Sequence, residues 1–218
     1  MTRRPRLLTT AAAGATALLL LTGCGGGDGG SKGNDKIAGA DTDTSPSASP
    51  SPSASQAADR PKIELPSDDI LTFTPEKAGD AVKDAILSDN AEFVRAMDAA
   101  IIAQNPRLPA LEYYTEGEGA AAAQKWVQGF KDDGLTVTGA VRYYDRQVNV
   151  ESKDKASLTY CGDESKGFNK VIKTGVIQKT KATKDSYVLY GIQVEKNDKG
   201  VWELVKIAST RGADRCQP

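Results

Sequence analysis

The stretch Arg142-Tyr-Tyr-Asp145 places a phenol and a carboxylate two positions apart, at Tyr143 and Asp145. Side chains at positions i and i+2 of a β-strand point to the same side, so the spacing predicts that these two groups share one side of a sheet. A tyrosine hydroxyl can donate a hydrogen bond to a substrate oxygen while an aspartate accepts a proton. The pair is therefore a candidate for isomerase, dehydratase or hydrolase chemistry. The plainer interpretation is a cross-strand aromatic residue followed by a turn-forming aspartate.

Three further aromatic residues complete the candidate ligand-binding set: Tyr114, Trp126 and Tyr190. Aromatic side chains supply apolar area together with a polar group, which suits small ligands. For Trp126 the simpler alternative is packing in the core of a helical segment.

The composition excludes several classes of site. The chain has 218 residues and no histidine, which removes Ser-His-Asp and Cys-His catalysis and every His-liganded metal centre. The formal net charge of −1, with both signs interspersed, argues against nucleic acid as a partner. The Gly25–Gly30 tract lacks the Lys-Ser/Thr of a phosphate-binding loop. We therefore expect no metal and no cofactor.

The first 24 residues have the layout of an export signal. Residues 1–6, MTRRPR, are basic, and Leu7 to Leu21 is apolar apart from three threonines. These fifteen residues would span ~22 Å as a helix, short of the ~30 Å of a bilayer core. They therefore match the apolar region of a signal peptide better than a transmembrane helix.

The tetrapeptide Leu21-Thr22-Gly23-Cys24 resembles the lipobox of bacterial lipoproteins. The resemblance implies cleavage after Gly23 and a diacylglycerol on Cys24. The mature chain would then be anchored to the outer face of the cytoplasmic membrane. The alternative is an ordinary signal peptide with an incidental cysteine.

Two cysteines remain, Cys161 and Cys216. In an exported protein two leftover cysteines usually pair, so we expect a structural disulfide between them.

The composition divides the chain into three parts: a signal peptide over 1–23, a tether over 24–66 and a globular domain over 67–218. The tether is rich in Gly, Ser, Asp, Ala, Thr and Pro and contains the run SPSASPSPSAS. Such a segment buries too little apolar surface to offset its ordering entropy, and we expect it to be disordered. A plain spacer is the simplest interpretation, and O-linked sugars are the alternative.

Apolar periodicity predicts helices first in the domain. We expect one helix from Thr74-Pro75 to about Ser88 and a second over 93–104. Residues 110–114, ALEYY, predict a brief strand. A third helix is expected over 119–134, with Trp126 and Phe130 facing inward and Gly134 ending it.

After Gly134 the period changes from 3.6 to 2, which predicts an antiparallel sheet. The expected strand segments are separated by turns at Lys153-Asp154-Lys155 and at Asn197–Gly200; they are LTVTGAVRYY, QVNVES, ASLTYC, SYVLYGIQVE and VWELVKIAS. Helices followed by an antiparallel meander predict an α+β fold with the helices on one face of the sheet.

This order of elements resembles the NTF2-like fold, also called cystatin-like or cone-shaped, and the final GVWELVKI resembles its last strand. The whole chain is also similar to small surface lipoproteins of Gram-positive bacteria. The resemblance implies a cone-shaped domain whose helices and curved sheet enclose a pocket, with Cys216 tied back to Cys161. Related domains catalyse reactions or only bind small molecules, so the fold leaves the function open.

A run of lysines lies in the second half of the domain: Lys166, Lys170, Lys173, Lys179, Lys181 and Lys184. It is a candidate contact for anionic wall polymers or lipid headgroups. A solvated strand-and-loop surface is the plainer alternative.

Three functions fit these observations. The first is a lipid-anchored surface protein whose domain binds a small ligand, a cell-wall component or another exported protein. The second is a small-molecule enzyme that uses Tyr143 and Asp145. The third is a passive structural protein of the envelope.

Overall fold

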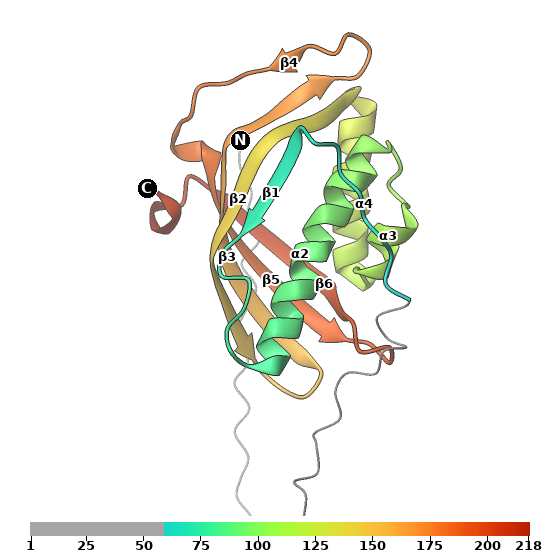
Figure 1. Ribbon diagram of the computed structural model, residues 1–218, viewed down its shortest axis with the longest axis vertical. Coiled ribbons are helices and arrows are strands. Elements are labelled where there is room, and N and C mark those ends of the chain that lie inside the picture. Colours follow the sequence, from blue (N-terminus) through green and yellow to red (C-terminus); the bar gives the residue numbers. More distant parts are fainter. Residues whose placement is uncertain (1–58) are drawn as a thin grey trace, which may run out of the picture. The chain divides into compact units, whose positions relative to one another are not determined.

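The computed structural model describes residues 59–218, so Cys24 and the expected signal peptide lie outside the described residues. Three helices come early in the domain: α2 (Ala81–Ile102), α3 (Pro109–Tyr113) and α4 (Gly117–Asp132). They lie together on one face of a curved sheet (Figure 1). The fold is α+β, as predicted, and it has the layout expected of an NTF2-like domain.

The sheet has six strands in the order β1-β2-β3-β5-β6, with the short β4 paired to β3. The strands are β1 (Asp69–Phe73), β2 (Leu135–Val150), β3 (Lys155–Val171), β4 (Ile177–Gln178), β5 (Tyr187–Lys196) and β6 (Trp202–Arg211). All pairings are antiparallel except that of β1, which runs parallel to β2. The predicted turns at 153–155 and 197–200 both separate consecutive strands.

The start of the first helix differs from the prediction. Thr74 and Pro75 follow β1 and are joined by a cis peptide bond, and α2 begins only at Ala81. Asp80 caps it, because its carboxylate accepts hydrogen bonds from the backbone N–H groups of Val82 and Lys83 at 3.1 and 2.9 Å. A capping aspartate thus sets the helix start instead of the Thr-Pro pair.

The two helices predicted over 75–88 and 93–104 are one continuous helix. Asp89 and Asn90 lie in its middle and are buried, and tertiary contacts satisfy both side chains in part. Asp89 accepts the Trp202 backbone N–H at 2.9 Å, and Asn90 accepts a hydrogen bond from Arg146 at 2.9 Å. Polar residues that interrupt the apolar pattern are therefore internal bonding partners and not a break between helices.

Residues 110–114, predicted as a strand, belong mostly to α3. Pro109 stands at its first position, where proline is favoured, and Leu111 is fully buried. Thr115, directly after the helix, makes an isolated parallel bridge to Leu204 in β6.

Helix α4 matches the prediction in its extent, and Gly134 follows it with a φ of 65°. The face that it buries was predicted only in part: Phe130 is partly buried and packs against the core as expected, but Trp126 does not. Gly119, Ala123 and Val127 pack inward, whereas Trp126 is 54% exposed. A Cβ on Gly119 would lie 2.3 Å from the Leu204 carbonyl oxygen, so the close approach of α4 to β6 requires glycine there and sets the inward face.

The chain contacts the domain upstream of the boundary expected at residue 67. Arg60 forms an ion pair with the buried Asp89, and Ile63 packs against the core. Strand β1, which follows, was not predicted. It forms one edge of the sheet, where it pairs with β2, and Figure 1 shows it between β2 and α2.

The predicted disulfide joins Cys161 on β3 to Cys216 in the short helix η2 (Asp214–Cys216), and both cysteines are fully buried. The Tyr144 hydroxyl donates a hydrogen bond to the Cys216 carbonyl on the same side. The disulfide thus fixes the C-terminus to the outer face of the sheet. Within residues 59–218, no helix combines the length and the hydropathy needed to span a bilayer.

Candidate functional site

The structure does not bring Tyr143 and Asp145 together. The pairing of β2 with β3 shifts register between Tyr144 and Gln147, and Asp145 has a φ of 50° at this irregularity. The extra residue breaks the alternation of sides on which the predicted pair depends. Tyr143 lies on the inner face, under the helices, with its ring stacked on Phe73 at 5.2 Å.

Asp145 lies away from Tyr143, at the outer corner of the domain, where the C-terminal residues Arg215 and Cys216 pack against β2. Its carboxylate is exposed and accepts a hydrogen bond from Arg215 Nη2 at 2.8 Å and one from Gln147 Nε2 at 2.8 Å. These bonds, that to Arg215 first, lower the pKa of Asp145 below its ordinary value of 3.8. An exposed carboxylate held in its charged form is a weak proton acceptor at neutral pH.

The acidic group with the largest electrostatic effect on Tyr143 is Asp98, which lies on α2. Its side chain keeps some exposed surface, yet protein atoms crowd the carboxyl group. This burial raises the pKa of Asp98 well above its ordinary value, and the neighbouring carboxylates of Asp69 and Glu164 raise it further. Asp98 therefore favours the protonated form, in which it can donate a hydrogen bond.

Tyr143 is similarly confined. Burial raises the pKa of its hydroxyl well above the ordinary value, with Asp98 as the next cause. Among the described residues, neither the Tyr143 hydroxyl nor the Asp98 carboxyl makes a hydrogen bond within the protein. Neither belongs to the fully buried polar atoms that lack a partner, so the oxygens of both side chains remain accessible to solvent or to a ligand.

A cluster of aromatic rings surrounds these two groups. The Tyr160 and Tyr190 rings stack at 5.0 Å, and the Tyr143 ring lies 6.0 Å from the first and 6.3 Å from the second. Gly162 on β3 makes room for them, because a Cβ there would meet Tyr190 Cε2 at 3.0 Å and Tyr143 Cε1 at 3.5 Å. The cluster therefore provides the aromatic lining for the polar pair.

The second carboxylate, Glu164, is already paired. It accepts the Tyr190 hydroxyl at 2.7 Å and forms an ion pair with Arg211 at 2.8 Å. The third, Asp69 at the start of β1, is 9% exposed, and its Oδ2 has no hydrogen-bond partner among the described residues. Burial, helped by Asp68, raises the pKa of Asp69 to about 6. Three carboxyl groups therefore lie in this region, and Arg211 neutralises the charge of one of them, Glu164.

We call Asp98, Tyr143, Tyr160, Tyr190 and Glu164 the inner site. Of the five ligand-binding candidates from the sequence, it contains Tyr143 and Tyr190. Tyr114 is buried away from it, beside Arg60 and Asp89, and Trp126 stands on the exposed side of α4 next to Phe130. The predicted site residues thus divide into two that meet and three that do not.

Asp98 and Glu164 were missed by the sequence analysis. A signal for Asp98 was present, because it follows the buried Val94 by four residues and precedes the buried Ile101 by three. These positions share one face of a helix, so an acidic residue there interrupts an apolar stripe. No comparable signal marks Glu164, because the expected strand ended at Cys161, whereas β3 continues to Val171 and includes Glu164.

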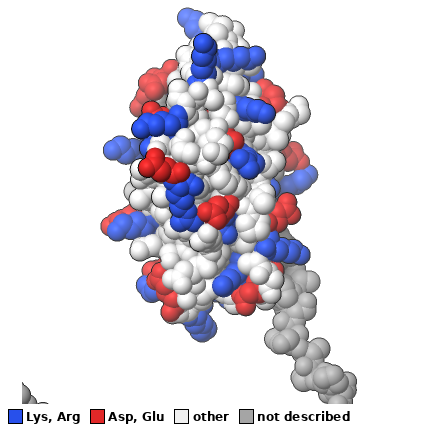
Figure 2. All heavy atoms as spheres, turned by 90° about the vertical axis from the view of Figure 1, so that its left-hand side faces the viewer, with Lys and Arg blue, Asp and Glu red and all other residues white. Residues whose placement is uncertain are grey.

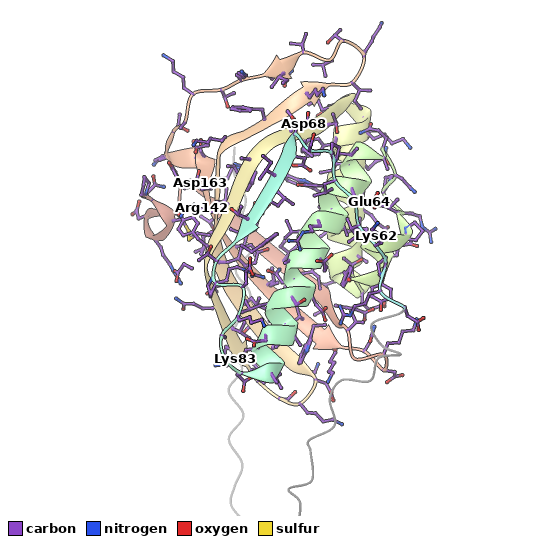
Figure 3. The ribbon with its side chains drawn as sticks, in the orientation of Figure 1. Lys62, Glu64, Asp68, Lys83, Arg142 and Asp163 are labelled. Carbon is purple, nitrogen blue, oxygen red and sulfur yellow. A yellow bond between two sulfur atoms is a disulfide. The ribbon has the colours of Figure 1, made fainter. Side chains whose placement is uncertain are left out.

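Two surface depressions in the described part of the chain lie elsewhere. One, of about 200 Å³, is lined by Ile70, Thr72, Arg142 and Asp163, among others. Arg142 and Asp163 project from the side of the sheet opposite the helices (Figure 3). In the same part of the chain, no group of three or more acidic or cysteine side chains is arranged to hold a metal ion.

No family model matches the sequence, and no curated protein matches it. Three solved structures are similar in shape. A ketosteroid isomerase-like protein from Erwinia carotovora atroseptica is 13% identical, has a TM-score of 0.41, and the match covers 62% of this chain and 98% of that one. A domain of unknown function with a cystatin-like fold from Nostoc punctiforme is 16% identical, with a TM-score of 0.38 and coverage of 62% and 79%.

The third is the intermembrane space region of the chloroplast protein ARC6, which is 10% identical, with a TM-score of 0.36 and coverage of 62% and 99%. The names of the three proteins differ in what they say of function. Likenesses this distant carry no argument about what this chain does. The class of the protein is therefore given by its own architecture: an α+β domain of the NTF2-like, or cystatin-like, type.

Proposed function

We propose that this protein is a lipid-anchored cell-surface protein whose domain binds a small, largely apolar molecule bearing an oxygen acceptor such as a carbonyl group. The observation that carries the proposal is the pair formed by Asp98 and Tyr143. Both groups lie among aromatic rings on the inner face, and neither has a hydrogen-bond partner among the described residues.

The chemistry of the pair selects the ligand. Burial raises the pKa values of Asp98 and Tyr143, which favours the protonated forms that can donate hydrogen bonds. A ligand oxygen with two lone pairs can accept from both, and the adjacent rings of Tyr190 and Tyr143 favour an apolar body. An anionic ligand is disfavoured, because Asp69 and Glu164 lie close by.

Three probes with one ring skeleton test this choice: the ketone 2-tetralone, the amine 2-aminotetralin and the hydrocarbon tetralin. We expect the ketone to bind most tightly in an NMR titration of residues 24–218 carrying Cys24→Ser. Tyr143→Phe should weaken ketone binding about 3- to 10-fold, which corresponds to one hydrogen bond. Asp98→Leu should weaken it by at least as much.

Matched controls come from the neighbouring corner of the molecule. Tyr144→Phe and Asp145→Asn change the same residue types, but their hydroxyl and carboxylate engage Cys216 and Arg215. Both variants should bind the ketone like the unaltered chain. Preference for the amine would mean that Asp98 is ionised and would overturn the assignment. Equal binding of all three probes, or none, would favour a passive structural domain.

The anchor is the second part of the proposal and is supported by the sequence alone. The basic residues, the apolar run and Leu21-Thr22-Gly23-Cys24 stand in the order that lipoprotein processing requires. Two acyl chains on Cys24 would hold the protein at the outer face of the cytoplasmic membrane. In cell fractionation, Cys24→Ala should move the protein out of the membrane fraction, and a variant that stays there would contradict the anchor.

An acid–base enzyme is the second candidate, with Asp98 in place of Asp145 beside Tyr143. The observation in its favour is the raised pKa of Asp98, which matches a group that gives up or takes a proton during a reaction. Deuterium exchange at the carbons next to the carbonyl of 2-tetralone, followed by NMR, separates enzyme from carrier. Exchange that the protein accelerates and Asp98→Asn slows would establish catalysis, and exchange at the buffer rate would leave binding alone.

A further inference from the structure

A basic hairpin projects from one end of the domain. It comprises residues 165–184, the second half of β3, the turn, β4 and the segment that follows. Beyond Asp163, β3 no longer pairs with β5, and only β2 and the two-residue β4 support it. In Figure 1 this segment rises above the rest of the domain, at the end opposite the turns at 151–154 and 197–200.

The hairpin is strongly charged with one sign. Its 20 residues contain six lysines and no aspartate or glutamate. Only Lys170 is in an ion pair among the described residues, with Asp68 at 3.6 Å. Two acidic residues at the end of α4, Asp132 and Asp133, lie near the hairpin, because the carbonyl of the following Gly134 accepts the Ile172 N–H. The six lysines outnumber them, so this end of the domain keeps a net positive charge. Figure 2 shows Lys and Arg side chains gathered at the upper end of the molecule.

The tip of the same hairpin exposes apolar side chains. Ile172, Val176 and Ile177 are 47%, 58% and 39% exposed, and they account for three of the seven large exposed hydrophobic residues of the described chain. Gly175, with a φ of 71°, makes the turn between them. The turn of an exposed hairpin ordinarily carries polar residues. Exposed apolar side chains flanked by lysines therefore require an explanation.

We propose that this hairpin docks onto an anionic lipid bilayer, with the lysines at the headgroups and Ile172, Val176 and Ile177 entering the boundary of the acyl chains. Lysines near such a surface are attracted by the negative headgroups, and the apolar side chains add the free energy of leaving water. An anionic polymer would attract only the lysines. The apolar tip therefore selects the bilayer as the partner. The proposal goes beyond the inner site and does not require the acyl anchor.

The test uses residues 24–218 with Cys24→Ser, so that no acyl chain contributes, and measures co-sedimentation with vesicles. We expect binding to vesicles of equal parts phosphatidylglycerol and phosphatidylcholine, and at least tenfold weaker binding to phosphatidylcholine alone. Binding should also fall as salt is raised, because screening weakens the lysine contribution.

Three variants separate the contributions. Ile172→Ser with Val176→Ser and Ile177→Ser keeps every charge, and we expect it to bind the anionic vesicles at least tenfold more weakly. Lys173→Gln with Lys179→Gln and Lys181→Gln should lose a similar factor. The matched control, Lys77→Gln with Lys125→Gln and Lys153→Gln, removes the same charge elsewhere and should lose less than threefold. All nine substituted residues are exposed, so thermal unfolding should show each variant folded.

Two outcomes would overturn the proposal. If the serine variant binds anionic vesicles as tightly as the unaltered chain, the tip does not enter the bilayer and the attraction is general to polyanions. If the unaltered chain does not bind anionic vesicles at low salt, the hairpin does not dock on membranes. Neither result bears on ketone binding at Asp98 or on fractionation of Cys24→Ala, so the two proposals fail separately.

Discussion

Two aspartates on opposite faces of one sheet have opposite electrostatic environments. Asp98 on the inner face is crowded by protein and lies near two other carboxylates, so its pKa is raised. Asp145 on the outer corner is exposed and paired with Arg215, so its pKa is lowered. A tyrosine of β2 lies on each side: Tyr143 with its hydroxyl unused and Tyr144 bonded to the Cys216 carbonyl.

The comparison shows what distinguishes a candidate site from a structural contact. At the outer corner Tyr144 and Asp145 both have partners in the protein, and the contact of Tyr144 with the Cys216 carbonyl helps to hold the C-terminus. At the inner site, Asp98 and Tyr143 make no hydrogen bond among the described residues, and their oxygens stay accessible to a ligand. The same residue types therefore serve a structural role on one face and remain available for binding on the other.

The largest effect is expected from breaking the outer corner. Cys161→Ala with Cys216→Ala removes a bridge between residues 55 apart and should lower the free energy of unfolding by about 2–5 kcal/mol. Chemical denaturation with and without a reductant measures it. In the folded state of this variant, Arg215 is no longer held beside Asp145 by the neighbouring disulfide. The pKa of Asp145 should then rise toward 3.8, while the pKa of Asp98 stays high. A fall in the pKa of Asp98 in the same variant would show that the two faces are not independent.

A smaller effect of the opposite sign is expected at the inner site. Because folding raises the pKa of Asp98, this group stabilises the native state at low pH and loses that contribution as pH rises through its folded pKa. Asp98→Asn should therefore be more stable than the unaltered chain at pH 9, by roughly 1–3 kcal/mol, with a smaller difference at pH 4. Denaturation at both values measures this difference.

Asp69 and Tyr143, whose pKa values are also raised, face this group and are present in both proteins, so the difference between the two curves reports on Asp98. A difference that stays constant from pH 4 to pH 9 would mean that Asp98 does not change its protonation within this range.

The smallest effect is expected at Asp145. Folding lowers its pKa, so its contribution is present above the ordinary value of 3.8 and is lost as pH falls through the folded pKa. Its ion pair with Arg215 is exposed, and such pairs contribute little. Asp145→Asn should lower stability at pH 7 by less than about 1 kcal/mol. A loss as large as that caused by removing the disulfide would show that the outer corner depends on this pair.

Much of the fold could be predicted from the sequence because its signals are local. The change of period after Gly134 predicted the long strands, and the turns at 153–155 and 197–200 followed from their residue types. Strand β1 could not be predicted in this way, since five residues acquire strand structure only by pairing in parallel with β2. The continuity of α2 depends likewise on distant partners of Asp89 and Asn90.

The inner site was predictable only in part. Tyr143 and Tyr190 stood out as aromatic residues in strand patterns, but the partner of Tyr143 was sought in the same strand. The irregularity at Asp145 turns that residue outward, and the nearby carboxyl comes from a helix 45 residues earlier in the chain. Such a meeting depends on how the helix crosses the sheet, which no short stretch of sequence specifies.

The most direct test of the inner site is a titration of the side-chain carboxyl ¹³C signals of residues 24–218 with Cys24→Ser. Spectra of Asp98→Asn and Asp145→Asn assign the two resonances. We predict an Asp98 midpoint well above 3.8 and an Asp145 midpoint below it. An Asp98 midpoint below the neutral range would mean that the inner carboxyl is ionised at neutral pH, and the proposed donor pair would not exist.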